Sequence, residues 1–241
     1  SPAPGLEPLL IPAILLVLVG LLFKVGAVPF HSWTPDAYQG APTPVTGFMA
    51  AATKAAAFGA MLRFLYVGVE SARWDYRYGV AAIAVLTMVV GAVVSVSQTD
   101  VKRLLAYSSV AHAGFILVGV LAFSTLGLRG VLFYALAYGL TTIAAFAVVS
   151  TVRQNDSEAT NLSQWAGLGQ RHPVVAGTFA FLLLAFTGIP LTSGFTAKFA
   201  AFAPAVESGT LGTVLVVIGV LASAVTAFVY VRIIVLMYFS D

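Results

Sequence analysis

The sequence predicts an all-α polytopic membrane protein with about seven transmembrane helices, two of them discontinuous. Of its 241 residues, 60% are hydrophobic and only 9% are charged, and the mean hydropathy is +0.98. This composition is far from that of a soluble domain. The apolar runs are also too long and too continuous for barrel strands, which alternate over about 10 residues.

Polar or turn-rich breaks divide the chain into stretches of about the 20 residues that cross a bilayer. We place the stretches at residues 9–38, 44–66, 79–98, 101–123, 127–152, 173–205 and 210–238. The whole chain, 1–241, is expected to form one membrane domain. Residues 1–8 lack the basic region of a signal peptide, so we interpret the first stretch as a retained helix. No Met opens the chain, and we expect its start to be a cut.

Two stretches are too long for a simple span, and each is interrupted near its middle. The first break lies around Gly26 and Pro29, and the second around Gly188 and Pro190. Proline lacks a backbone donor and clashes with the preceding helical turn, so both helices are predicted to be discontinuous. Broken helices in corresponding positions of two halves are typical of transporter ion sites.

Such paired breaks often belong to inverted repeats. We expect residues 9–66, a broken helix and the next helix, to end a first repeat. Residues 79–238 would form the second repeat, with its broken helix at 173–205. No strong residue-level similarity links the two parts.

One long polar connection, residues 153–172, separates the fifth and sixth stretches. Its 161–169 portion could form a short interfacial helix with Trp165 at the level of the lipid headgroups. The alternative is a solvated linker.

Three of the four lysines lie inside apolar stretches. A charge at the centre of a bilayer helix costs roughly 2.5 to 3.5 kcal/mol, so such residues indicate function. Lys54 lies in the middle of its span, where its side chain cannot easily reach water. Lys24 lies beside the first break. Lys198 follows the second break, where snorkelling toward the membrane surface is a competing explanation.

The acidic residues show the opposite distribution, because all nine lie at the ends of spans or in loops. Burial disfavours a charged ammonium, whereas a nearby carboxylate favours it. A buried lysine whose partner approaches and withdraws could therefore carry a proton reversibly. We expect the missing carboxylate to come from another part of the protein or from a neighbouring subunit.

Histidine and tyrosine residues could connect the lysines. His112, at the centre of the fourth stretch, can pass a proton between its two ring nitrogens, although a packing role is the alternative. Tyr134 and Tyr138, one turn apart, could add hydroxyls or only join helices. His31 follows the first break, where it could line a cavity or cap backbone groups, and His172 is expected at the membrane edge.

The sequence lacks the residues that several other kinds of chemistry need. With no Cys in the chain, thiolate ligands for iron–sulphur clusters or zinc, and disulfides, are excluded. The net charge of +3 comes from scattered residues, which argues against nucleic-acid binding. Paired carboxylates, metal-binding histidine pairs and phosphate-binding loops are likewise missing from the sequence.

Three long motifs resemble one family. These motifs are PFHSWTPDAYQGAPTPV and AATK within residues 23–63, QTDVKRLLAYSSVAHAGF at 98–115, and GIPLTSGFTAKF at 188–199. They resemble the antiporter-like proton-channel subunits of respiratory complex I, which are related to subunits of multisubunit sodium/proton antiporters. The lysine of AATK makes the chain most similar to subunit N, called subunit 2 in mitochondria and chloroplasts.

The resemblance implies an antiporter-like, inverted-repeat fold of about 14 helices, of which this chain would supply helices 7 to 13. It implies that Lys24 is the broken-helix lysine of a first half-channel and Lys54 the connecting lysine. His112 would be a central relay and Lys198 the terminal lysine of a second half-channel. The glutamate that pairs with these lysines would precede Ser1.

The implied function is proton translocation, without redox chemistry, in an NADH:quinone oxidoreductase of the bacterial cytoplasmic (inner) membrane. An organellar membrane is the less favoured location. No cofactor is expected in this chain, while NADH, FMN, iron–sulphur clusters and quinone would bind partner subunits. Expected partners are other membrane subunits, the lipid bilayer and the missing N-terminal half. The alternatives are a sodium/proton antiporter subunit and a structural scaffold whose lysines only snorkel.

Overall fold

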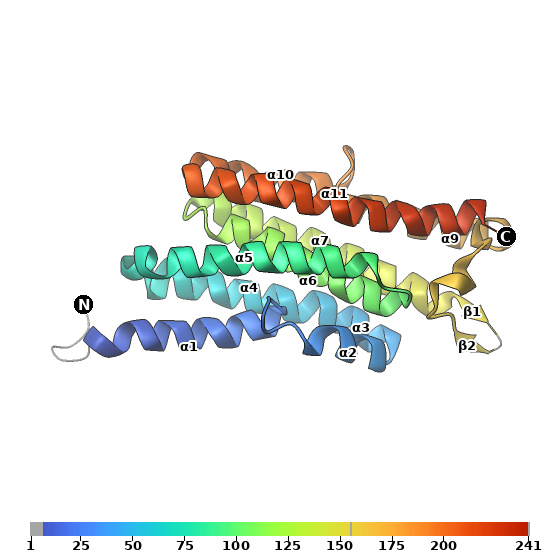
Figure 1. The fold of residues 1–241 in the computed structure, drawn as a ribbon, viewed down its shortest axis with the longest axis horizontal. Helices are drawn as coiled ribbons and strands as arrows, with labels where there is room; N and C mark the ends of the chain where they lie inside the picture. Colours follow the sequence, from blue (N-terminus) through green and yellow to red (C-terminus); the bar gives the residue numbers. More distant parts are fainter. Residues whose placement is uncertain (1–6, 155, 241) are drawn as a thin grey trace.

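The structure, a computed structural model, describes residues 7–154 and 156–240 as a bundle of long helices lying side by side (Figure 1). The α-helices are α1 (Glu7–Val25), α2 (Trp33–Gly40), α3 (Thr43–Phe48), α4 (Lys54–Arg63), α5 (Arg73–Val96), α6 (Val101–Val120), α7 (Thr125–Thr151), α8 (Leu168–Arg171), α9 (Pro173–Thr187), α10 (Ser193–Glu207) and α11 (Thr210–Phe239). The π-turns η1 (Met49–Thr53) and η2 (Phe64–Gly68) extend α3 and α4 into one helix.

Five helices are long and apolar enough to cross a membrane: Thr43–Gly68, Glu70–Val96, Val101–Val120, Thr125–Thr151 and Thr210–Phe239. The two broken helices, α1 with α2 and α9 with α10, complete the seven predicted stretches. At 15 residues, α9 is only about 22 Å long, less than the roughly 30 Å of a bilayer core. The polytopic helical fold with two discontinuous helices is therefore confirmed. The expectation for the start of the chain falls partly on residues 1–6, outside the described residues.

Each break starts at a glycine in the left-handed conformation. Gly26 has φ +76° and Gly188 has φ +83°, values that only glycine adopts without steric cost. The N–H of the residue after each glycine returns to the carbonyl five residues earlier, at 2.9 and 3.3 Å. This pattern is a Schellman motif, which ends a helix abruptly. The loop after the second glycine projects from the bundle (Figure 1), with Leu191 fully exposed.

A threonine on a neighbouring helix anchors the first break. The N–H of Val28 donates to Thr87 Oγ1 at 3.0 Å in a fully buried position.

Replacing this threonine tests the anchor. Thr87→Val keeps the side-chain shape but leaves the Val28 N–H unpaired, so we expect the free energy of unfolding to fall by about 1 to 3 kcal/mol. Thermal unfolding in detergent measures the loss. Thr178→Val is the control, because exposed Thr178 bonds only within its own helix, and equal effects would contradict the anchoring role.

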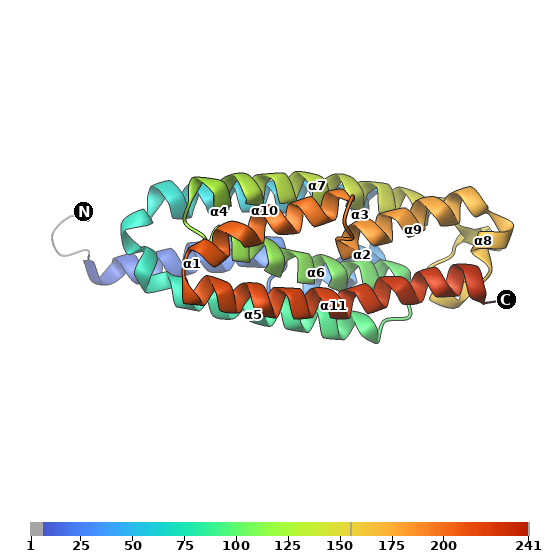
Figure 2. The ribbon, with the colours of Figure 1, turned by 90° about the horizontal axis from the view of Figure 1, so that it is seen from above.

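Helix α6 occupies the centre of the bundle. It packs against α2, α5, α7, α10 and α11, and both ribbon views place it among them (Figures 1 and 2). All its side chains are buried except Arg103 and Tyr107. Gly91 allows α5 to pack closely against α6, since a Cβ there would lie 2.4 Å from the backbone nitrogen of Ala111. Polar residues of α6 therefore face protein rather than lipid.

The long polar connection is more ordered than a solvated linker. It contains an antiparallel pair of two-residue strands, β1 (Arg153–Gln154) and β2 (Ser157–Glu158), then η4 (Leu162–Trp165) and α8. A short 3₁₀ helix thus forms within 161–169. The headgroup level expected for Trp165 stays a prediction, and its side chain is fully buried within the protein. Its Nε1 donates to Ala159 O at 2.8 Å, and its ring lies 4.7 Å from that of Phe179.

Candidate functional site

Lys54 lies at the end of the first broken half-helix. Its side chain is only 3% exposed, and Nζ donates to Val25 O at 2.7 Å and to Ser109 O at 2.9 Å. Val25 is the last residue of α1, where carbonyls have no N–H partner within the helix. The π-turn η1 directly precedes Lys54, a distortion that is frequent at functional sites. The ammonium thus joins α1 to α6.

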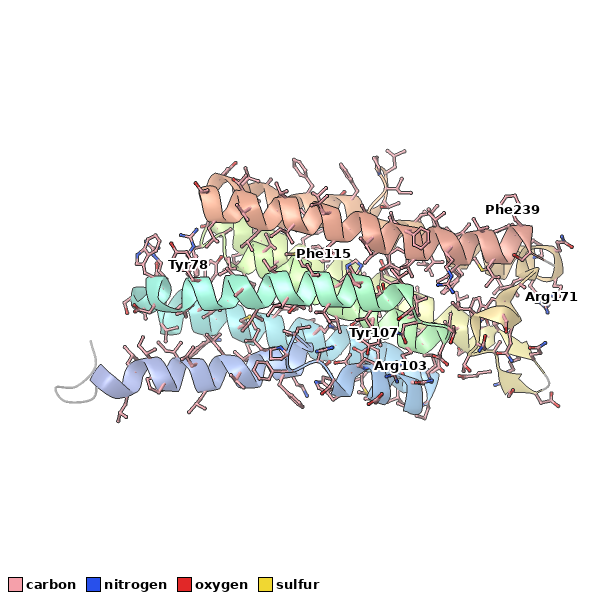
Figure 3. All side chains as sticks on the ribbon, in the orientation of Figure 1. Tyr78, Arg103, Tyr107, Phe115, Arg171 and Phe239 are labelled. Atoms are coloured by element: carbon pink, nitrogen blue, oxygen red, sulfur yellow. The ribbon has the colours of Figure 1, made fainter. Side chains whose placement is uncertain are left out.

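Lys198 makes equivalent contacts at the second break. Its Nζ donates to Phe186 O at 3.1 Å and Thr187 O at 2.7 Å, the last two carbonyls of α9. It also donates to Ser223 Oγ on α11 at 2.6 Å. The ammonium lies 5.0 Å from the ring centroid of Phe115, within the range of a cation–π interaction. Figure 3 shows Phe115 near the middle of the bundle.

The two lysines reach the breaks from different positions in the chain. Lys54 belongs to the helix after its break, whereas Lys198 belongs to the second half of the broken helix itself. Gly188 also makes room for Lys198, since a Cβ there would lie 3.1 Å from its Cδ. A third buried lysine, Lys102, donates to Ala41 O just past the end of α2 at 2.7 Å. Lys102 is the lysine that the sequence did not single out.

His112 is enclosed by aromatic side chains and is 2% exposed. Its Nδ1 lies 2.8 Å from the hydroxyl of Tyr134, and its Nε2 lies 3.3 Å from that of Tyr230. The ring centroid of Tyr138 lies 4.7 Å away. A cavity of about 10 Å³ adjoins His112 and both α7 tyrosines, which is about the room that one water molecule needs.

Helix α6 places His112 between the two ammonium groups. Ser109, whose carbonyl binds Lys54, lies one turn before His112, and Phe115, under Lys198, lies one turn after it. The six residue steps from Ser109 to Phe115 correspond to about 9 Å along the helix axis. Lys54, His112 and Lys198 therefore form a buried line across the bundle, which we call the central line.

Two hydroxyls beside the central line lack hydrogen-bond partners. Ser109 Oγ and Thr142 Oγ1 are buried without a partner, and the hydroxyl of Tyr138 lies near both. Here they extend the polar surroundings from Lys54 toward His112.

The remaining candidate residues lie away from this line. Lys24 is exposed on the outward face of α1. His31 is half-buried, with Nδ1 unpaired and its ring 6.3 Å from that of Tyr107. His172 is exposed and directly precedes α9. The structure therefore brings Lys54, His112, Lys198, Tyr134 and Tyr138 together and leaves Lys24 apart.

Carboxylates stay away from the central line in the part of the chain that the structure describes. The salt bridge found there joins Arg103 to Asp36 at 2.7 Å, at an exposed end of the bundle. Glu158 on β2 accepts a hydrogen bond from Thr43 Oγ1 instead. Within residues 7–154 and 156–240, no group of three His, Asp or Glu side chains is placed to hold a metal ion.

Two residues of α11 that contact the candidate site were missed by the sequence prediction. Ser223 binds Lys198, and Tyr230 binds His112. They are spaced by seven residues and therefore share one face of α11. Polar side chains at that spacing in an otherwise apolar helix were the signal that could have identified them.

Broken helices around an enclosed line of lysine and histidine are typical of membrane transport proteins. Residues 6–226 match the family described as "NADH:quinone oxidoreductase/Mrp antiporter, TM". The chain belongs to this family.

Curated relatives within the family are named for the oxidoreductase. Over 237 residues the chain is 63% identical to "NADH-quinone oxidoreductase subunit N 3" of Streptomyces griseus, covering 98% of this chain and 42% of that protein. The chain thus spans about two fifths of the length of the curated relatives it matches.

Solved structures share the fold. A chain of respiratory complex I from Thermus thermophilus with bound Aureothin has a TM-score of 0.82 and 38% identity, covering 98% of this chain and 52% of that one. A chain of the Mrp complex from Dietzia sp. DQ12-45-1b has a TM-score of 0.86 and 26% identity, covering 96% and 42%. The TM-scores are similar for the two structures, whereas the sequence identity is higher with the complex I chain than with the Mrp chain.

Proposed function

We propose that the longer protein containing this chain is a proton-translocating membrane subunit of an NADH:quinone oxidoreductase. The observation that carries the proposal is the placement of His112 between buried Lys54 and Lys198 on an enclosed helix. The names and identities of the relatives support the same assembly. NADH, FMN, iron–sulphur clusters and quinone then belong to partner subunits, which drive protonation changes here.

Each residue of the central line has a role in this proposal. Lys54 and Lys198 take up and release protons, and His112 relays between them with help from the hydroxyls of Tyr134 and Tyr138. Lys24 continues the path outward, where the rest of the protein supplies a carboxylate. The subunit lies in a bacterial cytoplasmic membrane among lipid and other membrane subunits, with its two breaks in inverted repeats 9–66 and 79–238.

Replacing Lys198 tests the proposal. In the intact complex reconstituted in vesicles, Lys198→Met should lower the rate of proton translocation by about tenfold or more, because positioned proton-transfer groups contribute at least that much. A pH-sensitive dye and NADH absorbance report translocation and oxidation together. The control is Arg232→Met, which removes an exposed cation that caps Val96 O away from the central line. Unchanged proton translocation per NADH in Lys198→Met would favour a structural scaffold.

The alternative is a subunit of a sodium/proton antiporter. It is supported by the family description and by the fold shared with the Mrp complex. Sodium uptake by the same vesicles, compared in sodium and potassium media, separates the two functions. Sodium transport that depends on Lys198 would favour the antiporter, whereas proton translocation that persists without sodium favours the oxidoreductase.

A further inference from the structure

Tyr230 holds the ring nitrogen of His112 that faces away from Tyr134. It comes from α11 and is fully buried. Its hydroxyl lies 3.3 Å from Nε2, while Tyr134 occupies Nδ1 at 2.8 Å. The ring of Tyr230 also stacks on Phe186 at 5.9 Å. Both nitrogens of a buried imidazole therefore have hydroxyl partners, supplied by two different helices.

Ser108 fixes the hydroxyl of Tyr230. Ser108 lies one turn before His112 on α6, and its Oγ hydrogen-bonds the Tyr230 hydroxyl in a fully buried position. Tyr230 is thus shared between two residues of the same helix face. This bridge ties α11 to α6 beside the central line and determines where the hydroxyl points.

Hydroxyl partners suit an imidazole that must change tautomer. A neutral imidazole has one N–H donor and one acceptor nitrogen, whereas a hydroxyl can donate or accept. With the proton on Nδ1, that nitrogen donates to Tyr134 and Nε2 accepts from Tyr230. With the proton on Nε2, the directions of both hydrogen bonds reverse. Neither tautomer leaves a buried nitrogen unpaired.

We propose that Tyr230, held by Ser108, is a positioning residue that keeps Nε2 of His112 hydrogen-bonded in both tautomers. When one nitrogen accepts a proton and the other releases one, the ring ends neutral and in the opposite tautomer. Tyr230 removes the penalty that an unpaired nitrogen would add to one of these states. The inference rests on the proposed function only in treating His112 as a relay.

Nitrogen-15 NMR of the full-length protein in lipid tests the contact without measuring transport. Histidine is labelled, and the His112 signals are assigned by their loss in His112→Gln. Tyr230→Phe keeps the ring and removes only the hydroxyl, so the Nε2 resonance should shift and the tautomer populations should change. Tyr76→Phe is the matched control, because Tyr76 is also buried but donates to Leu65 O at 3.3 Å. An unchanged Nε2 resonance in Tyr230→Phe would overturn the proposal.

Proton translocation by the intact complex then tests whether Tyr230 acts through His112. Tyr230→Phe should lower the rate by about tenfold, the factor that corresponds to one lost hydrogen bond, and Tyr76→Phe should not. In a His112→Gln background, Tyr230→Phe should add little further loss, because residues that act together are not additive. Additive losses would contradict a positioning role. Unchanged translocation in His112→Gln alone would reject the proposed relay role of His112. The NMR result would still test the contact between Tyr230 and Nε2.

Discussion

Lys54→Met is expected to reduce proton translocation by the intact complex about 100-fold, the scale of a lost proton-transfer group. Methionine keeps much of the length of the side chain but cannot carry a proton. The same change leaves Val25 O and Ser109 O without their donor, so stability should also fall, by about 1 to 3 kcal/mol. Dye-detected proton uptake per NADH and thermal unfolding measure the two effects separately.

Two further variants separate proton transfer from helix capping. Lys54→Arg restores a cation and hydrogen-bond donors, yet arginine stays protonated in proteins, so translocation should remain low. Lys102→Met removes another buried lysine that caps Ala41 O outside the central line. It should lower stability and leave translocation near normal. Equal loss of translocation in Lys54→Met and Lys102→Met would mean that capping, not proton transfer, explains the effect.

Gly194→Ala is expected to be the most damaging single change to the fold. A Cβ at Gly194 would lie 1.7 Å from Ala185 O, where the end of α9 meets the start of α10. Backbone cannot yield as a flexible side chain does, so we expect a loss of more than about 3 kcal/mol. The yield of folded protein in detergent and its Tm would report this loss.

Gly59→Ala is the matched control for this prediction. Gly59 lies within α4, and a Cβ there meets nothing within 4 Å. Alanine favours a helix over glycine by about 1 kcal/mol, so Gly59→Ala should leave the Tm equal or slightly higher. A Gly194→Ala protein with the same Tm as the wild type would show that the two half-helices do not need their close approach.

Much of the fold follows from sequence because its signals are strong and local. Runs of about 20 apolar residues predict spans, and the Gly–Pro pairs predicted both breaks close to where Gly26 and Gly188 end their helices. The burial of Trp165 was not predicted, for a physical reason. Its amphipathic ring suits a membrane interface, but a partner ring, Phe179, and a backbone acceptor, Ala159, were available inside the protein.

The candidate site was predicted in composition but not in geometry. Lys54, His112 and Lys198 stood out because charge and imidazole are rare in apolar helices. Tyr230 did not, because its seven-residue spacing from Ser223 shows that the two share a face of α11 but not that this face packs against other helices. For the same reason the sequence did not show which way Lys24 points. Lys24 lies on the surface of α1 rather than in the central line.

Ending α1 at Gly26 and α9 at Gly188 places the negative pole of a helix dipole, about half an elementary charge, beside Lys54 and Lys198. Unlike a carboxylate, these peptide carbonyls cannot be neutralised by a proton and cannot move away while the half-helix persists. Each ammonium therefore lies beside a partial negative charge that does not change with pH. An acidic group elsewhere would act in addition to this constant attraction from the broken helices.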